Sequence, residues 1–212
     1  MLLPHRHRSA LLEPLSLFPL PNAQEWTGKI AYLDRDGVLN IGSPTYINCV
    51  EELIILPNAA KSVGALRRAG FRICVVTNQS PIGRGWWSHE TLAEIHDELI
   101  IQFGDEDEDA VLDLILYSPY SPRDNSHARK GSPGMLEAGR QLIEFAERGS
   151  TLTAALLRYD TTWDASLYSS NDEQSVMVGD RDADMLAGAA YGVRTLRCEP
   201  SIGIADVIYD II

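Results

Sequence analysis

Hydrophobic positions along the chain form short apolar runs that alternate with longer amphipathic stretches. Each apolar run stops at a polar turn, as a buried strand does; these runs are residues 30–33, 71–76, 111–117 and 175–178. Between them, apolar residues recur at helical spacing in residues 57–69, 88–103, 132–148 and 182–191. The alternation predicts an α/β fold, a Rossmann-like three-layer sandwich with a mainly parallel central sheet.

The remaining segments carry weaker patterns. We expect residues 1–27 to form an N-terminal extension that either packs loosely on the domain or forms a tail. We expect residues 28–212 to form the main domain. Weak periodicity in residues 150–174 predicts an insertion, either a loop or a partly helical excursion. Residues 195–198 and 207–208 predict a last pair of strands.

Composition and charge narrow the function. With 212 residues, 45% hydrophobic and 23% charged, the chain has the balance of a globular protein with one good core or at most two small domains. The 18 basic and 30 acidic residues give a net charge of −12, which argues against a nucleic-acid partner. Three separated cysteines favour a reducing, cytoplasmic location, and no apolar run is long enough to predict a membrane span.

Polar residues with catalytic potential follow the predicted strands. Asp34 and Asp36 come directly after the first strand, where one carboxylate can attack an electrophile while the other handles a proton. Thr77 and Asn78 end the second strand and can donate hydrogen bonds to a phosphoryl oxygen, although either pair alone is also common in turns. Ligands of parallel sheets bind at the carboxyl ends of the strands, so we expect these residues to meet there.

Two further groups belong to the same predicted edge. Lys130 offers a point charge and Arg129 a bidentate fork, in the loop after the third strand; the alternative is a solvated basic pair. Asp180, Asp182 and Asp184 follow the fourth strand. A few carboxylates completed by water fit magnesium better than zinc.

Together, in this order, these groups resemble the haloacid dehalogenase-like (HAD-like) phosphatase superfamily, and within it the D,D-heptose 1,7-bisphosphate phosphatases and histidinol-phosphate phosphatases. The matching segments are residues 34–40, Leu56-Pro57, residues 77–80 with 83–85, Arg129-Lys130 with residues 133–136, and Gly179-Asp180 with Asp184 and Ala187-Gly188. The resemblance covers roughly residues 28–198. The short gaps at residues 40–57 and 85–117 predict that no large cap domain is present.

The resemblance implies a magnesium-dependent phosphomonoesterase. In it, Asp34 forms an aspartyl-phosphate, Asp36 acts as acid and then base, and Thr77 and Lys130 complete the catalytic set. Magnesium is then held by Asp34, by the backbone carbonyl of Asp36 and by Asp180, while Asp184 either orients Lys130 or lies in the outer coordination shell. The substrate-binding candidates are Asn40, Asn78, Gln79, Ser80, Arg84, Arg129 and Arg181.

The departures from the family pattern lie around the entrance to the expected substrate-binding site. Relatives commonly hold a structural zinc with cysteines, but the matching stretches here are Ser118-Pro119-Tyr120-Ser121-Pro122 and Ser126-His127-Ala128. One histidine cannot replace four ligands, so we predict no structural zinc. Without a zinc, we expect the loop at 118–129 to be more mobile and to set substrate choice.

The expected substrate is a small phosphorylated metabolite, in the first place a sugar phosphate such as D-glycero-D-manno-heptose 1,7-bisphosphate. Histidinol phosphate is the alternative substrate, and a non-catalytic HAD-fold scaffold is the alternative from another functional class. The five retained residues Asp34, Asp36, Thr77, Lys130 and Asp180 argue against a scaffold. We expect a monomer or a weak dimer.

Overall fold

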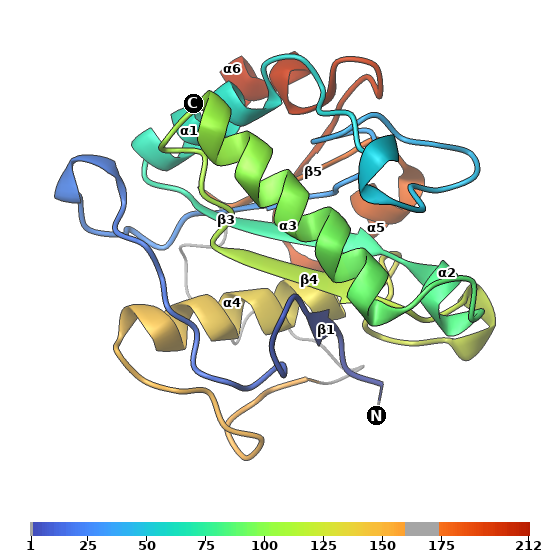
Figure 1. The fold of residues 1–212 in the computed structure, drawn as a ribbon. Coiled ribbons are helices and arrows are strands. Elements are labelled where there is room, and N and C mark those ends of the chain that lie inside the picture. Colours follow the sequence, from blue (N-terminus) through green and yellow to red (C-terminus); the bar gives the residue numbers. More distant parts are fainter. Residues whose placement is uncertain (1, 160–173) are drawn as a thin grey trace.

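The computed structural model describes residues 2–159 and 174–212, and it places a six-stranded sheet at the centre of the molecule (Figure 1). The strand order is β1-β4-β3-β2-β5-β6. All neighbouring strands are parallel except β1, which pairs antiparallel with β4. The strands are β1 (His5–Arg6), β2 (Ile30–Leu33), β3 (Arg72–Asn78), β4 (Leu114–Ser118), β5 (Val176–Gly179) and β6 (Arg194–Arg197).

Helices cover both faces of this sheet. They are α1 (Ala59–Arg68), α2 (Ser80–Gly83), α3 (His89–Glu106), α4 (Gly134–Glu147), α5 (Asp182–Tyr191) and α6 (Ile208–Ile211). Short 3-10 turns are η1 (Pro21–Ala23), η2 (Val50–Glu52), η3 (Pro122–Asp124) and η6 (Gly203–Asp206). The predicted three-layer α/β sandwich is confirmed. Residues 41–55 contain only η2 and hold no cap domain.

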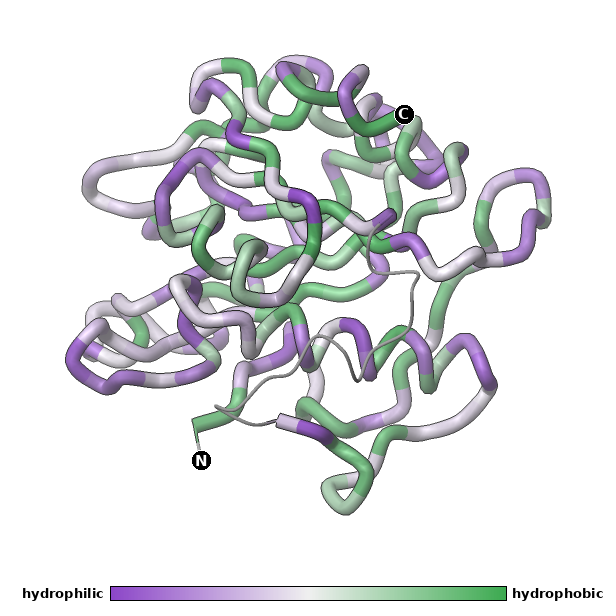
Figure 2. Tube along the Cα trace, turned by 180° about the vertical axis from the view of Figure 1, so that it is seen from behind, coloured by the Kyte–Doolittle hydropathy of each residue, from purple (hydrophilic) through white to green (hydrophobic). Residues whose placement is uncertain are grey.

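Side chains that alternate along the strands build two cores. Ala31 and Leu33 of β2 join a cluster with α1, α3 and α6 on one face of the sheet. Ile30 and Tyr32 join a second cluster with α4 and α5 on the other face. Figure 2 shows the hydrophobic colour concentrated in the central segments and the hydrophilic colour in outer loops. Because both faces are covered, the strands are apolar at successive positions, which explains why apolar runs located them.

Helix ends follow the signals in the sequence. The Ser88 hydroxyl accepts a hydrogen bond from the Thr91 amide at the start of α3. Gly192, at φ 92°, ends α5 in the left-handed conformation that favours glycine. Among the described residues, no helix is long and apolar enough to span a membrane.

Three segments differ from expectation or lie outside the description. Residues 207–208 do not form a strand: Val207 follows η6 and Ile208 begins α6. Both side chains pack into the core cluster on the α1 side of the sheet, while their carbonyls accept helical hydrogen bonds from the amides of Asp210 and Ile212. His5 and Arg6, in the segment expected as an extension, form edge strand β1. Most of the predicted insertion at 150–174 lies outside the described residues.

A buried histidine in α3 makes stability dependent on pH. His96 is fully buried, and both its ring nitrogens lack hydrogen-bond partners among the described residues. Burial lowers the pKa of His96 well below the ordinary 6.5, and the nearby charges of Arg35 and His7 lower it further. His96 is therefore neutral in the folded protein.

We expect His96 to lower the free energy of unfolding as the pH drops below 6.5, whereas Asp34, whose pKa is raised to about 7, acts in the opposite direction, so the slope of the wild type is compared with that of His96→Leu. In that range the unfolded chain protonates His96 and the folded chain does not, so the unfolded state binds more protons. His5 and His7, whose pKa values burial also lowers, act in the same direction as His96. Urea unfolding across this range measures the slope. His96→Leu should flatten the slope, and an unchanged slope in that variant would contradict the assignment.

Candidate active site

Two strand-end carboxylates and a buried lysine form the centre of the site. Asp34 follows β2, and its backbone amide donates to the Val178 carbonyl of β5 at 3.0 Å. The Lys130 ammonium lies 2.5 Å from Asp34 Oδ1 and 2.7 Å from Asp184 Oδ1, and all three side chains are nearly inaccessible to solvent. The lysine therefore bridges the carboxylates contributed after β2 and β5.

Burial and charge set the protonation of this centre. Burial, aided by the neighbouring charges of Asp184 and Asp36, raises the pKa of Asp34 to about 7 against the opposing charge of Lys130. Burial opposes the charge on Lys130 as well, but Asp34 and Asp184 outweigh it and raise the pKa of Lys130. The lysine thus remains a cation and stabilises negative charge in its vicinity.

Asp180, the last member of the carboxylate cluster, packs against the turn that follows Asp34. Gly37 adopts φ +82°, and a Cβ there would lie 2.7 Å from Asp180 Oδ2, so only glycine leaves room for this approach. Oxygens of Asp34, Asp180 and Asp184 all lie within 4.8 Å of one another. Asp180 Oδ1 is buried and lacks a hydrogen-bond partner among the described residues. The donor set is all oxygen, which fits a hard divalent cation such as magnesium.

Asp36 is held by a ring of donors. Arg35 is fully buried and places Nη2 2.9 Å from both Asp36 oxygens. The Asn40 side-chain amide donates to Asp36 Oδ1 at 3.0 Å, and the Gln79 amide donates to Asp36 Oδ2 at 3.3 Å. Burial alone would raise the pKa of Asp36, but Arg35 and these amides outweigh it and hold the pKa below its usual value. Asp36 is therefore a carboxylate in this arrangement.

Asn40 and Gln79, which the sequence predicts as substrate-binding residues, have fully buried side chains that donate hydrogen bonds to Asp36. Gln79 also donates to the Thr77 hydroxyl at 2.9 Å, which links Thr77 to the same network. No role was expected for Arg35. The one signal in the sequence was an arginine between two aspartates at the end of an apolar run, where a charged side chain is buried only if it is paired.

The loop carrying Lys130 is fixed to the end of β3. Asn78 Oδ1 accepts a hydrogen bond from the Lys130 amide at 2.9 Å, so this side chain positions the lysine backbone. Ser80 is buried at the start of α2. The structure thus brings the predicted residues after β2, β3 and β5, together with Lys130 from the loop after β4, to one edge of the sheet.

The three candidate arginines lie further out. Arg181 is exposed, with Nε 3.6 Å from Asp180 Oδ2. The Arg84 guanidinium lies 5.1 Å from the ring centre of the exposed Trp86. Arg129 donates from Nη1 to the Tyr120 carbonyl at 2.8 Å. Of the three arginines, only Arg181 contacts a carboxylate of the cluster, and none contacts Lys130 through an interaction found among the described residues.

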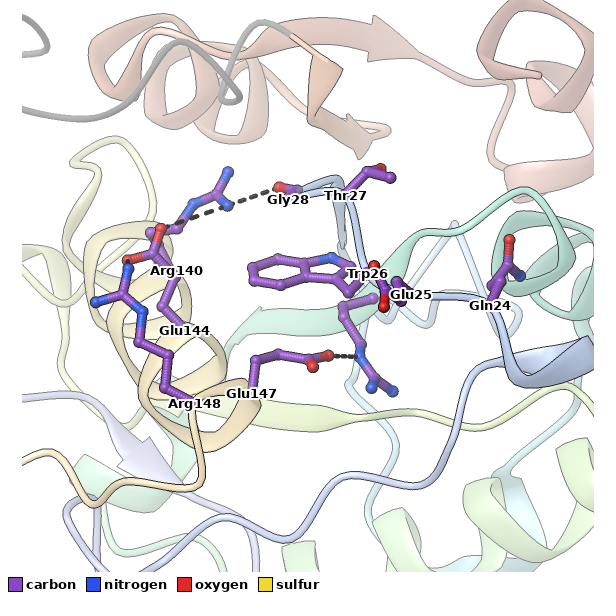
Figure 3. A pocket seen from close by; sticks show the side chains of 10 residues that line it. Gln24, Glu25, Trp26, Thr27, Gly28, Arg140, Glu144, Glu147 and Arg148 are labelled. Atoms are coloured by element: carbon purple, nitrogen blue, oxygen red, sulfur yellow. Dashed lines mark hydrogen bonds and ion pairs between the residues drawn. The ribbon is translucent and has the colours of Figure 1, made fainter.

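A separate hollow of about 750 Å³ lies at the opposite edge of the sheet (Figure 3). Its lining includes Gly28 before β2 and Arg72 at the start of β3, so the hollow lies at the amino ends of these strands. Its buried arginines have structural partners: Arg72 contacts Glu147 at 2.6 Å, and Arg140 donates to the Gly28 carbonyl at 2.6 Å. The hydrogen bond from Arg140 to Gly28 joins α4 to the segment before β2. None of the residues that line the hollow belongs to the carboxylate cluster.

The parallel sheet with carboxylates and a lysine at its strand ends defines a hydrolase of the haloacid dehalogenase-like class, and residues 127–198 match the family model described as HAD-hydrolase-like. The chain is 36% identical over 167 residues to the D-glycero-beta-D-manno-heptose-1,7-bisphosphate 7-phosphatase of Pseudomonas aeruginosa, covering 77% of this chain and 83% of that protein. The protein of the same name from Haemophilus ducreyi is 30% identical, with 79% and 80% coverage. The chain belongs to this family of phosphatases.

Solved structures show the same fold. A D,D-heptose 1,7-bisphosphate phosphatase from B. bronchiseptica, solved with magnesium and phosphate, has a TM-score of 0.65 at 24% identity and covers 86% of this chain and 97% of its own. A HAD-like phosphatase from Mesorhizobium loti has a TM-score of 0.63 at 24% identity, covering 94% of this chain and 90% of its own. The resemblance inferred from the strand-end motifs is confirmed.

Proposed function

We propose that this phosphatase is a magnesium-dependent phosphomonoesterase acting on a phosphorylated sugar, with D-glycero-D-manno-heptose 1,7-bisphosphate as the first candidate. The observation that carries the proposal is the buried Lys130 between Asp34 and Asp184, with Asp180 beside them. The names of the relatives that cover most of this chain support the substrate.

Asp34 is the proposed nucleophile: its carboxylate attacks phosphorus to form an aspartyl-phosphate, the ester bond between phosphorus and the sugar oxygen breaks, and the leaving alkoxide takes the proton that Asp36 donates. Asp34 and Asp180 would hold magnesium together with the backbone carbonyl of Asp36, and the ion would neutralise charge between the carboxylate and the phosphate. Asp184 contacts Lys130 at 2.7 Å, which supports a role in orienting the lysine. Lys130 and Thr77 supply fixed positive potential and hydrogen bonding to the phosphoryl oxygens.

Asp36 is the proposed acid and base. Arg35, Asn40 and Gln79 lower its pKa and so keep it ionised, which leaves it free to accept a proton when the hydrolytic water attacks the aspartyl-phosphate in the second step. The first step requires Asp36 to be protonated. The negative charge of a phosphate bound nearby raises the pKa of an adjacent carboxyl, so Asp36 gains its proton when the substrate arrives.

Substrate binding beyond the phosphate would involve Arg181, which contacts Asp180, Arg129, which directly precedes Lys130, and Arg84 beside Trp86. Trp86 is 60% exposed and packs edge-on against Tyr46 at 5.9 Å between ring centres, so it is not a core residue. A cytoplasmic location, the monomeric or weakly dimeric state and the lack of a structural zinc remain predictions from the sequence.

Phosphate release from a panel of esters tests the proposal. The panel contains heptose 1,7-bisphosphate, histidinol phosphate, hexose phosphates and nucleotides, each with magnesium and with excess chelator. We expect kcat/KM for the heptose bisphosphate to exceed that for histidinol phosphate by roughly tenfold or more, with release abolished by the chelator. Preference for histidinol phosphate would overturn the substrate, and no release from any ester would support the scaffold alternative.

A further inference from the structure

The N-terminal residues 2–8, here called the strap, contact the loop that carries the site's cations. The Tyr120 hydroxyl donates a hydrogen bond to the Leu3 carbonyl at 2.8 Å. The Ser126 hydroxyl and the Tyr159 hydroxyl both donate to the Leu2 carbonyl, at 3.4 Å and 3.5 Å. Two side chains of the loop at 119–130 thus hold the backbone of the strap.

Sheet pairing brings the strap to this loop. His5 lies opposite Tyr117 and Arg6 opposite Leu116 in the pairing of β1 with β4. The His7 amide extends the pairing by donating to the Ile115 carbonyl at 3.0 Å. Because the loop at 119–130 begins where β4 ends, the strap lies directly beside its first residues, as Figure 1 shows for β1 and β4.

The other side of the strap is fastened to α3. His7 Nε2 lies 3.0 Å from Asp97 Oδ1, and Arg8 forms an ion pair with the same carboxylate at 2.6 Å. The His5 ring stacks on His89 with 4.7 Å between ring centres. The strap is therefore anchored independently of the loop and can serve as a fixed support for it.

Tyr120 connects the strap to the active site. Its hydroxyl bonds the strap, and its carbonyl accepts the hydrogen bond from Arg129. Arg129 directly precedes Lys130, which contacts Asp34. The path from the strap to the lysine therefore runs through one tyrosine and one arginine, each of which forms a hydrogen bond along it.

We propose that the strap is a positioning element of the active site, which holds the loop at 119–130 so that Arg129 and Lys130 face the substrate phosphate. This inference rests on the proposed function for its effect on catalysis. Tyr120 is the principal positioning residue, because it is bonded both to the strap and to Arg129.

The first test removes the Tyr120 hydroxyl and keeps its ring. We expect Tyr120→Phe to raise KM for the best phosphate ester of the panel about fivefold, the effect of one lost hydrogen bond, and to increase deuterium uptake in residues 119–131. Tyr209→Phe is the matched control, since Tyr209 is 89% exposed in α6. Unchanged KM and unchanged exchange in Tyr120→Phe would overturn the proposal.

The second test breaks the backbone pairing. His7→Pro removes the amide that donates to Ile115, whereas His7→Ala removes the same side chain and keeps that amide. We expect His7→Pro to exceed His7→Ala in both KM and deuterium uptake at 119–131. If His7→Pro lost only thermal stability, with KM and deuterium uptake equal to those of His7→Ala, the strap would stabilise the fold without positioning the active site, and the proposal would be wrong.

Deuterium exchange separates this inference from the proposed function. If the wild-type protein hydrolyses no ester, the proposed function fails, yet the exchange of residues 119–131 in the two variants still decides whether the strap holds the loop. If the wild-type protein is active and the variants match it in KM and exchange, only the strap proposal fails.

Discussion

Asp34→Asn is expected to reduce phosphate release by at least about a thousandfold while the protein stays folded. The amide cannot act as a nucleophile and is a poorer magnesium ligand than a carboxylate. Stability should be retained in metal-free buffer, because the substitution removes a buried carboxylate whose pKa burial has already raised to about 7, and Asp184 still pairs with Lys130. Phosphate release and thermal unfolding of the purified variant measure both effects.

Asp182→Asn provides the control for this experiment. Asp182 is also an aspartate after a strand, but its side chain is exposed and lies at the start of α5. It should retain activity close to that of the wild type. If Asp34→Asn kept more than roughly a tenth of the wild-type rate, Asp34 would not be the nucleophile.

Lys130→Met is expected to lower kcat by about a hundredfold or more, the cost of removing a preorganised charge from the transition state. The same change should strengthen magnesium binding, since Asp34 and Asp184 lose a competing cation at 2.5 Å and 2.7 Å. Without magnesium the variant should be less stable by roughly 3 kcal/mol, because two buried carboxylates lose their partner. Activity assays, calorimetric magnesium titration and unfolding with and without the ion measure these changes.

Lys61→Met is the matched control, since Lys61 is exposed and lies 3.9 Å from Glu106. Lys61→Met should leave kcat, the affinity for magnesium and the stability without magnesium near their wild-type values. Weaker magnesium binding in Lys130→Met would contradict the competition between lysine and metal, and unchanged kcat would exclude Lys130 from the catalytic set.

The fold could be predicted because strands buried on both faces are apolar at every position. Residues 30–33 were located with their exact bounds, and polar residues at the strand ends indicated where the site lies. The pairing of β1 could not be predicted, since His5 and Arg6 carry no apolar pattern and depend on contact with β4 over a hundred residues away. Residues 207–208 were misassigned because a short apolar pair fits a strand or a helix equally well.

Site residues were predictable where the family motif itself specifies the catalytic side chain, as for Asp34 and Lys130. The residues that support this reacting set were harder to predict from the sequence, because their roles depend on which side chains pack against one another in the folded protein. Asn40 and Gln79 belonged to the expected motif, but their amides hold Asp36, and Arg35 contributes a buried charge that spacing alone does not reveal. Tyr120 likewise depends on a contact with Leu3, far away in the sequence.

The pairing of β1 with β4 also bears on solubility. Without β1, β4 would be the last strand on its side of the sheet, and its free amides and carbonyls could pair with another chain. A strand of two residues is enough to occupy part of this edge, and the charged Arg6 and Arg8 discourage a further strand from adding beside it. A variant that lacks residues 2–8 should therefore aggregate more readily than the full chain, because β4 would then be the exposed edge strand on this side of the sheet.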